Sequence, residues 1–304
     1  VGLGFLTTGG AGSLRGADCN QNGAQDSSEL GGTNPYVFTG FAVPVGGVPL
    51  SIAAGDFNGD RLLDLVTANY ILNDNVYSSI GHSVLLQQAD NTFVESQLAV
   101  PDTGGIVAAD FNNDRKVDLV AGGKLLLGRG DGTFAEPLPL PALEGFPDPP
   151  GVCDAADLDN NGALDLRVNY VTLEPWFRVE TRVLLCNRDG TFSMQTSVPC
   201  GSFDGLPVFS AIGDLDRDGI LDLATTTMFT SSIKLYRGHA DGTFTNSGFL
   251  SAPNKENGGL AGADVNGDGY DDLLVVDHNP VALGLYRNNA DGTFRPRVDV
   301  SFNV

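Results

Sequence analysis

Five short segments of the sequence repeat the spacing D-x-[DN]-x-[DN]-x-x-x-D, which places oxygen-bearing side chains at positions one, three, five and nine. Ca²⁺ is a hard cation that takes six to eight oxygen ligands, whereas Mg²⁺ prefers to keep its waters. A tight loop of alternating carboxylates and amides, joined by the carbonyl of position seven, can supply such a shell. We therefore predict five Ca²⁺ sites, with the ligands Asp56, Asn58, Asp60 and Asp64 in loop one; Asp110, Asn112, Asp114 and Asp118 in loop two; Asp157, Asp159, Asn161 and Asp165 in loop three; Asp214, Asp216, Asp218 and Asp222 in loop four; and Asp264, Asn266, Asp268 and Asp272 in loop five.

The charge of the chain agrees with cation binding. Asp and Glu number 38 against 17 Lys and Arg, so the net charge is −21. Such an acidic surface argues against nucleic acid and anionic membranes as partners. No run of about 18 apolar residues is present, which argues against membrane insertion. Asp, Asn and Gly also mark ordinary turns, and halophile adaptation scatters acids over a surface. Five loops in register favour ligation over both of those readings.

The five loops differ at position six, where a Ca²⁺ loop of this kind turns sharply and favours Gly. Loops three, four and five carry Gly162, Gly219 and Gly269, whereas loops one and two carry Arg61 and Arg115. A non-Gly residue in the left-handed conformation costs about 1–2 kcal/mol, and Arg adds a positive charge. We therefore expect loops one and two to bind Ca²⁺ more weakly.

The loops belong to a longer internal repeat. Their first Asp recurs after 54, 47, 57 and 50 residues, a period that suits one four-stranded propeller blade. Each loop is followed by an apolar run and a turn that ends in Phe, as in DGTF. Asp-Gly between apolar runs predicts a hairpin with positive φ at both turn positions. Calcium-binding β-helices repeat every nine or so residues, so that fold is disfavoured.

The expected fold is all-β, a β-propeller of four-stranded blades over residues 37–304. Five blades are clear, at about 51–100, 104–140, 152–200, 209–250 and 259–303. In each blade the metal loop joins the first two strands and the DGTF-type turn joins the last two. Both therefore lie on one face of the ring, and the two longer kinds of loop lie on the other.

Residues 1–36 carry a sixth loop with the spacing D-x-N-x-N-G-x-x-D-x-x-E. This spacing is close to an EF-hand loop and resembles dockerin-like and thrombospondin type 3 calcium loops. Residues 1–6 and 36–45 can add strands, so the segment forms either a degenerate sixth blade or a calcium loop packed on a five-bladed ring. The predicted ligands of this sixth Ca²⁺ site are Asp18, Asn20, Asn22, Asp26 and Glu29.

The face opposite the metal loops is the predicted ligand-binding face. Its loops, at 69–82, 141–151, 169–181 and 200–207, are long and rich in aromatic residues. Exposed aromatic rings can stack on sugars or contact a protein, although they can also simply cover blade edges. The candidate ligand-binding residues are Tyr77, Phe146, Tyr170 and Trp176.

Signals for catalysis and for disulfides are weak. No HExxH or GxSxG motif is present, and Arg129-Gly130-Asp131 occupies an ordinary hairpin turn. Cys186 and Cys200 flank one hairpin and could pair across it, which would leave Cys19 and Cys153 for a second bridge; free thiols are the alternative. Four cysteines allow three pairings, and the spacing does not select one.

The Asp loops together with the DGTF turns resemble the FG-GAP/VCBS repeat family, whose members include the integrin α-subunit propeller and certain fungal lectins. The resemblance covers about residues 37–304. It implies a propeller, usually of seven blades, with Ca²⁺ in the loops between first and second strands. Only five full repeats are visible in this chain, which leaves the closure of the ring open.

The function hypothesis is an extracellular calcium-binding module that binds or adheres to carbohydrate or protein. Extracellular Ca²⁺ is millimolar and fills weak sites. The chain begins at Val1 without a leader, which fits either a removed signal peptide or a fragment. The alternatives are a propeller-type glycan hydrolase or lyase, and a structural component of a cell-surface layer or fibre.

Overall fold

The computed structural model describes residues 5–6, 43–45, 47–73, 76–100, 105–144, 151–172, 178–198, 207–227, 232–252, 257–278 and 281–300. The regular structure in these ranges is β-strand, and they contain no helix that is long and apolar enough to cross a bilayer. The predicted ligands Asp18, Asn20, Asn22, Asp26 and Glu29 lie outside the described residues.

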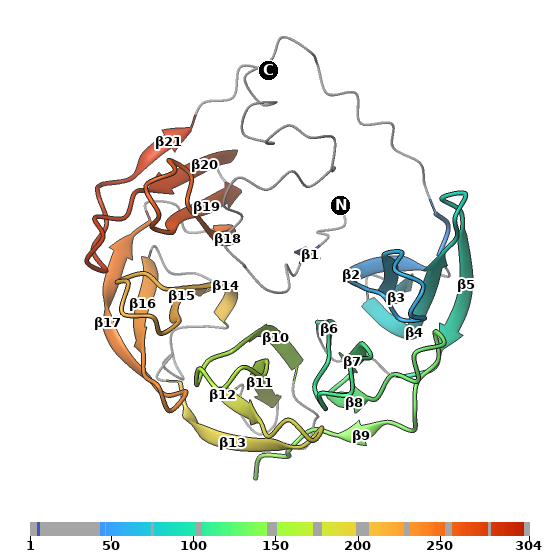
Figure 1. Cartoon of the computed structure of the whole chain (residues 1–304). Coiled ribbons are helices and arrows are strands. Elements are labelled where there is room, and N and C mark those ends of the chain that lie inside the picture. The colour runs from blue at the N-terminus through green and yellow to red at the C-terminus, as the bar shows by residue number, and fades with distance from the viewer. Residues whose placement is uncertain are drawn as a thin grey trace.

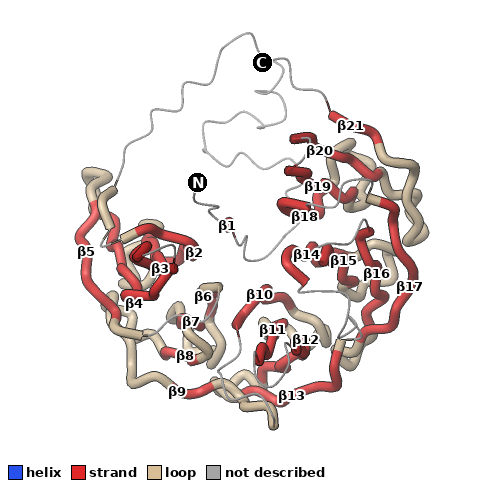
Figure 2. Tube along the Cα trace, turned by 180° about the vertical axis from the view of Figure 1, so that it is seen from behind, coloured by secondary structure: helices blue, strands red, loops and turns tan. Residues whose placement is uncertain are grey.

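The described strands form five sheets, antiparallel except for one short N-terminal strand, and Figure 1 shows them arranged as blades around a centre. The first strand of each blade lies nearest the centre and the fourth lies at the rim; the reverse view in Figure 2 shows the same order. The predicted five-bladed all-β propeller is thus confirmed. The strands are β2 (Val48–Gly55), β3 (Asp64–Asn73), β4 (Val76–Gln87) and β5 (Phe93–Leu98) in blade one; β6 (Val107–Ala109), β7 (Asp118–Ala121), β8 (Lys124–Leu126) and β9 (Leu138–Pro139) in blade two; β10 (Gly151–Ala156), β11 (Asp165–Thr172), β12 (Arg178–Cys186) and β13 (Phe192–Ser197) in blade three; β14 (Pro207–Gly213), β15 (Asp222–Thr227), β16 (Ser232–Gly238) and β17 (Phe244–Ser251) in blade four; and β18 (Asn257–Ala263), β19 (Asp272–His278), β20 (Val281–Tyr286) and β21 (Val298–Val300) in blade five.

One short N-terminal strand joins blade one rather than a blade of its own. β1 (Phe5–Leu6) pairs in parallel with β2, with Phe5 opposite Ser51. Of the two alternatives for the N-terminal segment, a strand in a separate sixth blade does not hold for the two residues that are described. Residues 43–45, at the end of another predicted strand, form no strand.

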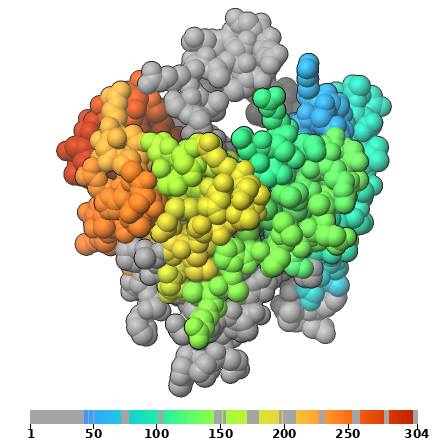
Figure 3. Space-filling view, turned by 60° about the horizontal axis from the view of Figure 1, so that its bottom comes forward, coloured from blue at the N-terminus to red at the C-terminus, as the bar shows by residue number. Residues whose placement is uncertain are grey.

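The cores of the propeller lie between neighbouring blades, as β3 and β7 show. Val66 and Ala68 of β3 pack with Leu119 of β7. Val120, on the other face of β7, packs with Leu166 of β11 in the next core. Alternate residues of one strand thus face the preceding and the following blade, and Figure 3 shows neighbouring blades packed side by side from the orange to the cyan parts of the chain.

Two of the predicted binding loops are strand hairpins instead. β3 and β4 extend to Asn73 and Val76, and β11 and β12 extend to Thr172 and Arg178. Tyr170 was predicted to be an exposed ligand-binding residue, but it lies in β11 with 0% of its surface exposed. Its hydroxyl donates to the Pro141 carbonyl at 2.5 Å, and burial raises its pKa to about 12. The prediction for Tyr170 is therefore wrong.

The structure does not test the other three predicted ligand-binding residues. Tyr77 lies in β4, and its side chain is outside the described part of the structure. Phe146 and Trp176 also lie outside the described residues. These three residues remain predictions.

Of the two alternatives for Cys186, a bridge to Cys200 or a free thiol, the structure shows the free thiol. Cys186 is a free, buried thiol. Its Sγ donates to the carbonyl of Phe111 in the preceding blade, 3.1 Å away. Burial raises the pKa of this thiol, so Cys186 is a packing residue that links two blades.

The DGTF-type turns are hairpins, as predicted, but of another type. The Gly of the turn has positive φ, as at Gly132 (82°), whereas the Asp before it does not. That Asp accepts hydrogen bonds instead: Asp131 Oδ1 lies 3.0 Å from the backbone nitrogen and 2.6 Å from the hydroxyl of Thr133. The recurring Asp-x-Thr pattern therefore adds a side-chain hydrogen bond to the turn. In blades two, three and five the residue before the Asp is also left-handed, as at Gly130, Arg188 and Ala290.

Candidate metal centres

The five metal loops and the five hairpin turns lie at the same end of the sheets, as predicted. The position-nine Asp shows this directly, since it begins the second strand and bonds the end of the third. In blade three, Asp165 Oδ1 accepts from the Cys186 nitrogen at 2.8 Å, and Oδ2 accepts from the Leu158 nitrogen at 2.8 Å. We call this end of the ring the metal face.

All five position-nine carboxylates are buried and bonded to the third strand, and four of them also accept from a loop nitrogen through Oδ2. The exception is Asp272, whose buried Oδ2 accepts no hydrogen bond. Asp222 is 4% exposed and the other four are 0% exposed. Their Oδ1 atoms accept from a backbone nitrogen at the end of the third strand at 2.8–2.9 Å. These residues therefore hold each loop to its hairpin before any metal is considered; they are Asp64, Asp118, Asp165, Asp222 and Asp272.

Burial makes these carboxylates hard to ionise. Desolvation raises the pKa of Asp165 and of Asp222 to about 6, and the backbone hydrogen bonds oppose it only in part. Desolvation likewise raises the pKa of Asp64, Asp118 and Asp272. Neighbouring acids of the same loop contribute to the increase, so a bound cation would favour the ionised forms.

The other predicted ligands accept hydrogen bonds from the backbone of their own loop. In loop three, Asp157 Oδ1 accepts from the Asn161 nitrogen at 2.9 Å and Oδ2 accepts from the Gly162 nitrogen at 2.8 Å. Asp159 Oδ1 also accepts from the Asn161 nitrogen, at 3.1 Å. The Asn161 carbonyl-type Oδ1 accepts from the Ala163 nitrogen at 2.7 Å. Positions one, three and five thus turn their oxygens toward the inside of the loop.

The backbone confirms the expected turn at position six and adds a second one. Arg61 and Arg115 have φ of 68°, and the glycines of the other three loops have φ of 84–89°. Position four is left-handed as well, which the sequence reasoning missed. Gly or Asn at this position was the available signal in four loops, and Arg217 of loop four gave none. The residues are Gly59, Asn113, Asn160, Arg217 and Gly267, with φ of 60–79°.

Two loops bring three carboxylates together closely enough to share an ion. In loop three these belong to Asp157, Asp159 and Asp165, and in loop four to Asp214, Asp216 and Asp218, with oxygens within 4.8 Å of one another. Loops one, two and five have Asn at position three, so an amide oxygen replaces one carboxylate there.

A buried oxygen without a partner shows that the residues of loop four fit a cation. Asp214 Oδ1 is buried and accepts no hydrogen bond, whereas the equivalent oxygen of Asp157 accepts one. Such an orphaned carboxylate oxygen is costly unless a cation or water satisfies it. A hard divalent cation with oxygen ligands suits this donor set.

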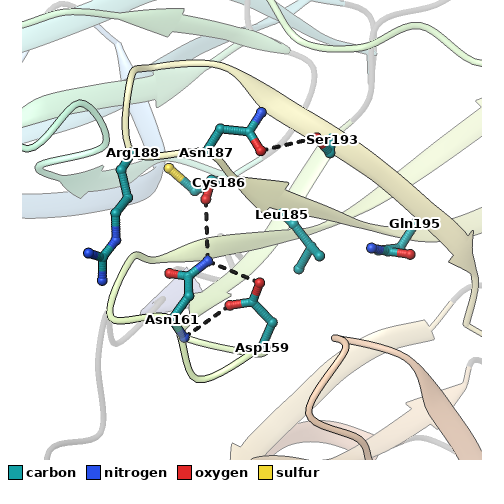
Figure 4. Close-up of a pocket in the computed structure, with 8 residues that line it drawn as sticks. All are labelled: Asp159, Asn161, Leu185, Cys186, Asn187, Arg188, Ser193 and Gln195. Atoms are coloured by element: carbon teal, nitrogen blue, oxygen red, sulfur yellow. Dashed lines mark hydrogen bonds between the residues drawn. The ribbon is translucent and has the colours of Figure 1, made fainter.

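A shallow pocket of about 520 Å³ opens beside loop three (Figure 4). Asp159 and Asn161 line it on the loop side, and Ser193 and Gln195 of β13 line it on the strand side. Asn161 Nδ2 donates to Asp159 Oδ2 at 3.0 Å, so the two loop residues present a joined polar edge. The volume falls in the range of about 300–1,000 Å³ that is usual for small-ligand sites.

The side chains of His82, His239 and the Arg-Gly-Asp turn are buried or bonded within their own blade. His82 is fully buried in β4. His239 Nε2 lies 3.0 Å from the Thr245 hydroxyl within its own hairpin. The Asp131 carboxylate is bonded to Thr133, as in the sister turns.

Comparison with known proteins supports the repeat. The profile of the FG-GAP-like repeat matches residues 214–275 and 264–304, which contain loops four and five. No curated protein matches the sequence.

Solved structures share the fold at low identity. A lectin from Agrocybe aegerita that recognises non-reducing terminal N-acetylglucosamine is 16% identical with a TM-score of 0.51, over 81% of this chain and 65% of the lectin. The periplasmic gluconolactonase PpgL of Pseudomonas aeruginosa is 15% identical with a TM-score of 0.50, over 83% of this chain and 70% of the enzyme. The chain thus spans slightly less than two thirds of the lectin's length. At these identities, the likeness shows the propeller fold alone.

Proposed function

The chain is a β-propeller with FG-GAP-like repeats, and on that premise we propose that it is an extracellular, calcium-stabilised module that binds a carbohydrate or protein ligand. The observation that carries the proposal is loop three, where the oxygens of Asp157, Asp159 and Asp165 lie within 4.8 Å of one another. The net charge of −21 supports a need for bound cations.

The ligands that we propose for Ca²⁺ follow from the geometry of the loops. Positions one, three and five direct side-chain oxygens inward, and position nine adds a buried carboxylate. When bound, Ca²⁺ would supply positive charge that offsets the mutual repulsion of these acids. Because the position-nine residue also holds the third strand, the ion would stabilise the whole blade rather than the loop alone.

The pocket beside loop three is our candidate for the ligand. Ser193, Gln195 and Asn187 offer hydroxyl and amide groups, which suit the hydroxyl groups of a sugar or the backbone of a peptide. Two of the proposed Ca²⁺ ligands line the same pocket. A ligand there would therefore bind only while loop three keeps its metal-bound shape.

A calcium titration tests the proposal. A ligand that binds only the folded state stabilises it, by about 2.7 kcal/mol per site at 100 times its dissociation constant. We expect the melting temperature to fall in EDTA and to rise with Ca²⁺, and calorimetry to count more than one ion per chain. We also expect Asp159→Ala to remove one ion, with Asp189→Ala, an exposed turn residue of the same blade, as the matched control.

The ligand itself is tested on a glycan array in Ca²⁺ and in EDTA. Binding that requires Ca²⁺ and is lost in Gln195→Ala would support a carbohydrate site in this pocket. A protein with no thermal or calorimetric response to Ca²⁺ would contradict the metal sites on which the proposal depends.

A further inference from the structure

Loop four differs from loop three because a side chain from outside the loop forms ion pairs with two of its carboxylates. Arg237 lies near the end of β16, and its Nη2 is 3.0 Å from Asp216 Oδ2 and 2.8 Å from Asp218 Oδ2. One guanidinium nitrogen thus sits between the carboxylates of positions three and five. These are two of the three carboxylates that are grouped closely enough to share an ion.

The first three blades have leucine where blade four has Arg237. Counted back from the Phe of the hairpin, the equivalent residues are Leu86, Leu127 and Leu185. A Cβ built on Gly242 of blade four would meet Leu185 Cδ2 at 2.7 Å, so Leu185 packs against the hairpin turn of the following blade. Leu86 packs in the same way against Gly132 of blade two. Arg237 turns toward its own metal loop instead.

Blade five offers a natural comparison, because Arg287 is its equivalent of Arg237. Within the described residues, the ion pairs of Arg237 with Asp216 and Asp218 have no counterpart between Arg287 and loop five. The sequence position alone therefore does not explain the contact. The conformation of Arg237 and the second carboxylate of loop four, Asp216 in place of Asn, both contribute.

The chemistry of the contact matches that of a bound cation. The positive guanidinium lies against both carboxylates, as a bound cation would. The guanidinium uses Asp216 Oδ2 and Asp218 Oδ2, which a divalent ion in the loop would also need. The Arg237 side chain is half-exposed, so water and salt screen its attraction and a divalent ion can displace it.

We propose that Arg237 is a built-in cation of loop four that competes with Ca²⁺, so that loop four fills only at higher Ca²⁺ than loop three. Metal entry then releases the guanidinium from Asp216 and Asp218 into solvent on the metal face. This inference rests on the proposed calcium binding and adds an order of filling to it. It also explains how four acids of loop four coexist without metal.

The test replaces Arg237 with the leucine that sister blades carry at this position. Calorimetry and native mass spectrometry would count Ca²⁺ ions and measure dissociation constants for wild type, Arg237→Leu and the control Arg287→Leu. We expect one weak site of the wild type to tighten by about tenfold in Arg237→Leu, the order expected from two partly screened ion pairs. Arg287→Leu should leave every site unchanged.

A second readout does not depend on calcium affinity. In EDTA, Arg237→Leu removes the counter-charge of loop four, so its melting temperature should fall below that of Arg287→Leu. Arg237→Gln, which keeps a polar side chain of similar length, replaces the leucine variant if that protein does not fold. Normal calcium binding by the wild type with unchanged sites in the Arg237 variant would overturn this inference alone. No calcium binding by either protein would overturn the proposed function as well.

Discussion

Loops three and four show how one spacing of acids produces two different electrostatic sites. Both keep a buried position-nine Asp whose pKa burial raises to about 6. Both group three carboxylates within 4.8 Å. In loop three one of these acids, Asp159, lines an open pocket, whereas in loop four Arg237 forms ion pairs with two of them. The Asp spacing determines the shape of the loop. The net charge of the loop also depends on residues outside the motif, such as Arg237.

The largest expected effect comes from the part that the two loops share. Asp165→Ala and Asp222→Ala each leave two buried backbone N–H groups without acceptors, at about 1–3 kcal/mol per group. We expect each variant to lose about 3 kcal/mol or more of unfolding free energy in urea at pH 7. The exposed Asp189→Ala should lose far less. Equal losses in all three variants would show that the buried carboxylates do not hold the blades.

The pH dependence of stability sharpens the comparison next. Because burial raises the pKa of Asp165 and Asp222 to about 6, the folded state keeps protons that the unfolded state has released above about pH 4. In EDTA, the unfolding free energy should therefore fall from pH 4 to just above pH 6. The exposed turn carboxylates, such as Asp189, have a lowered pKa because Thr191 bonds them, so their contribution changes below pH 4.

Calcium should reverse that pH dependence, since the ion binds the deprotonated carboxylates. Denaturation at each pH in EDTA and in saturating Ca²⁺ measures both curves. Asp165→Asn and Asp222→Asn should each flatten the EDTA curve. An EDTA curve that rises between pH 4 and pH 6 would contradict the raised pKa values.

The smallest effect concerns the link from loop four to loop five. Arg217 Nη1 donates to the Tyr270 hydroxyl at 2.8 Å, and its guanidinium carbon lies 4.9 Å from the centre of the Tyr270 ring. Tyr270→Phe removes the hydrogen bond and keeps the ring, so it should cost less than about 1 kcal/mol. A chemical denaturation curve checks this, and a loss of several kcal/mol would mean that this link is a main contact between blades four and five.

The sequence predicted the parts of the molecule that recur. Five Asp spacings and five DGTF-type turns have one geometric solution, so the blades and the shared metal face followed from them. Position six was predicted correctly at Arg61 and Arg115, because the local turn demands φ > 0 there whatever the residue.

The features that were missed depend on contacts between segments far apart in the chain. Tyr170 was expected in a loop because strand length cannot be judged from turn signals, yet β11 continues past it. Cys186 has a partner in the preceding blade, which no cysteine count reveals. Arg237 lies 19 residues after Asp218, and only the folded blade brings them together.

The position-two residues of the metal loops form contacts between successive blades. Phe57 and Phe111 are buried against the hairpin Phe of the following blade, with ring centres 5.7 Å from Phe134 and Phe192, whereas Val265 of blade five is 50% exposed. In blades one and two, the position-two residue therefore packs against the blade that follows in the chain. The position-two contacts thus link successive blades in chain order, and the exposed Val265 leaves the corresponding edge of blade five uncovered. We expect local unfolding to begin at this edge of blade five and to proceed towards the earlier blades.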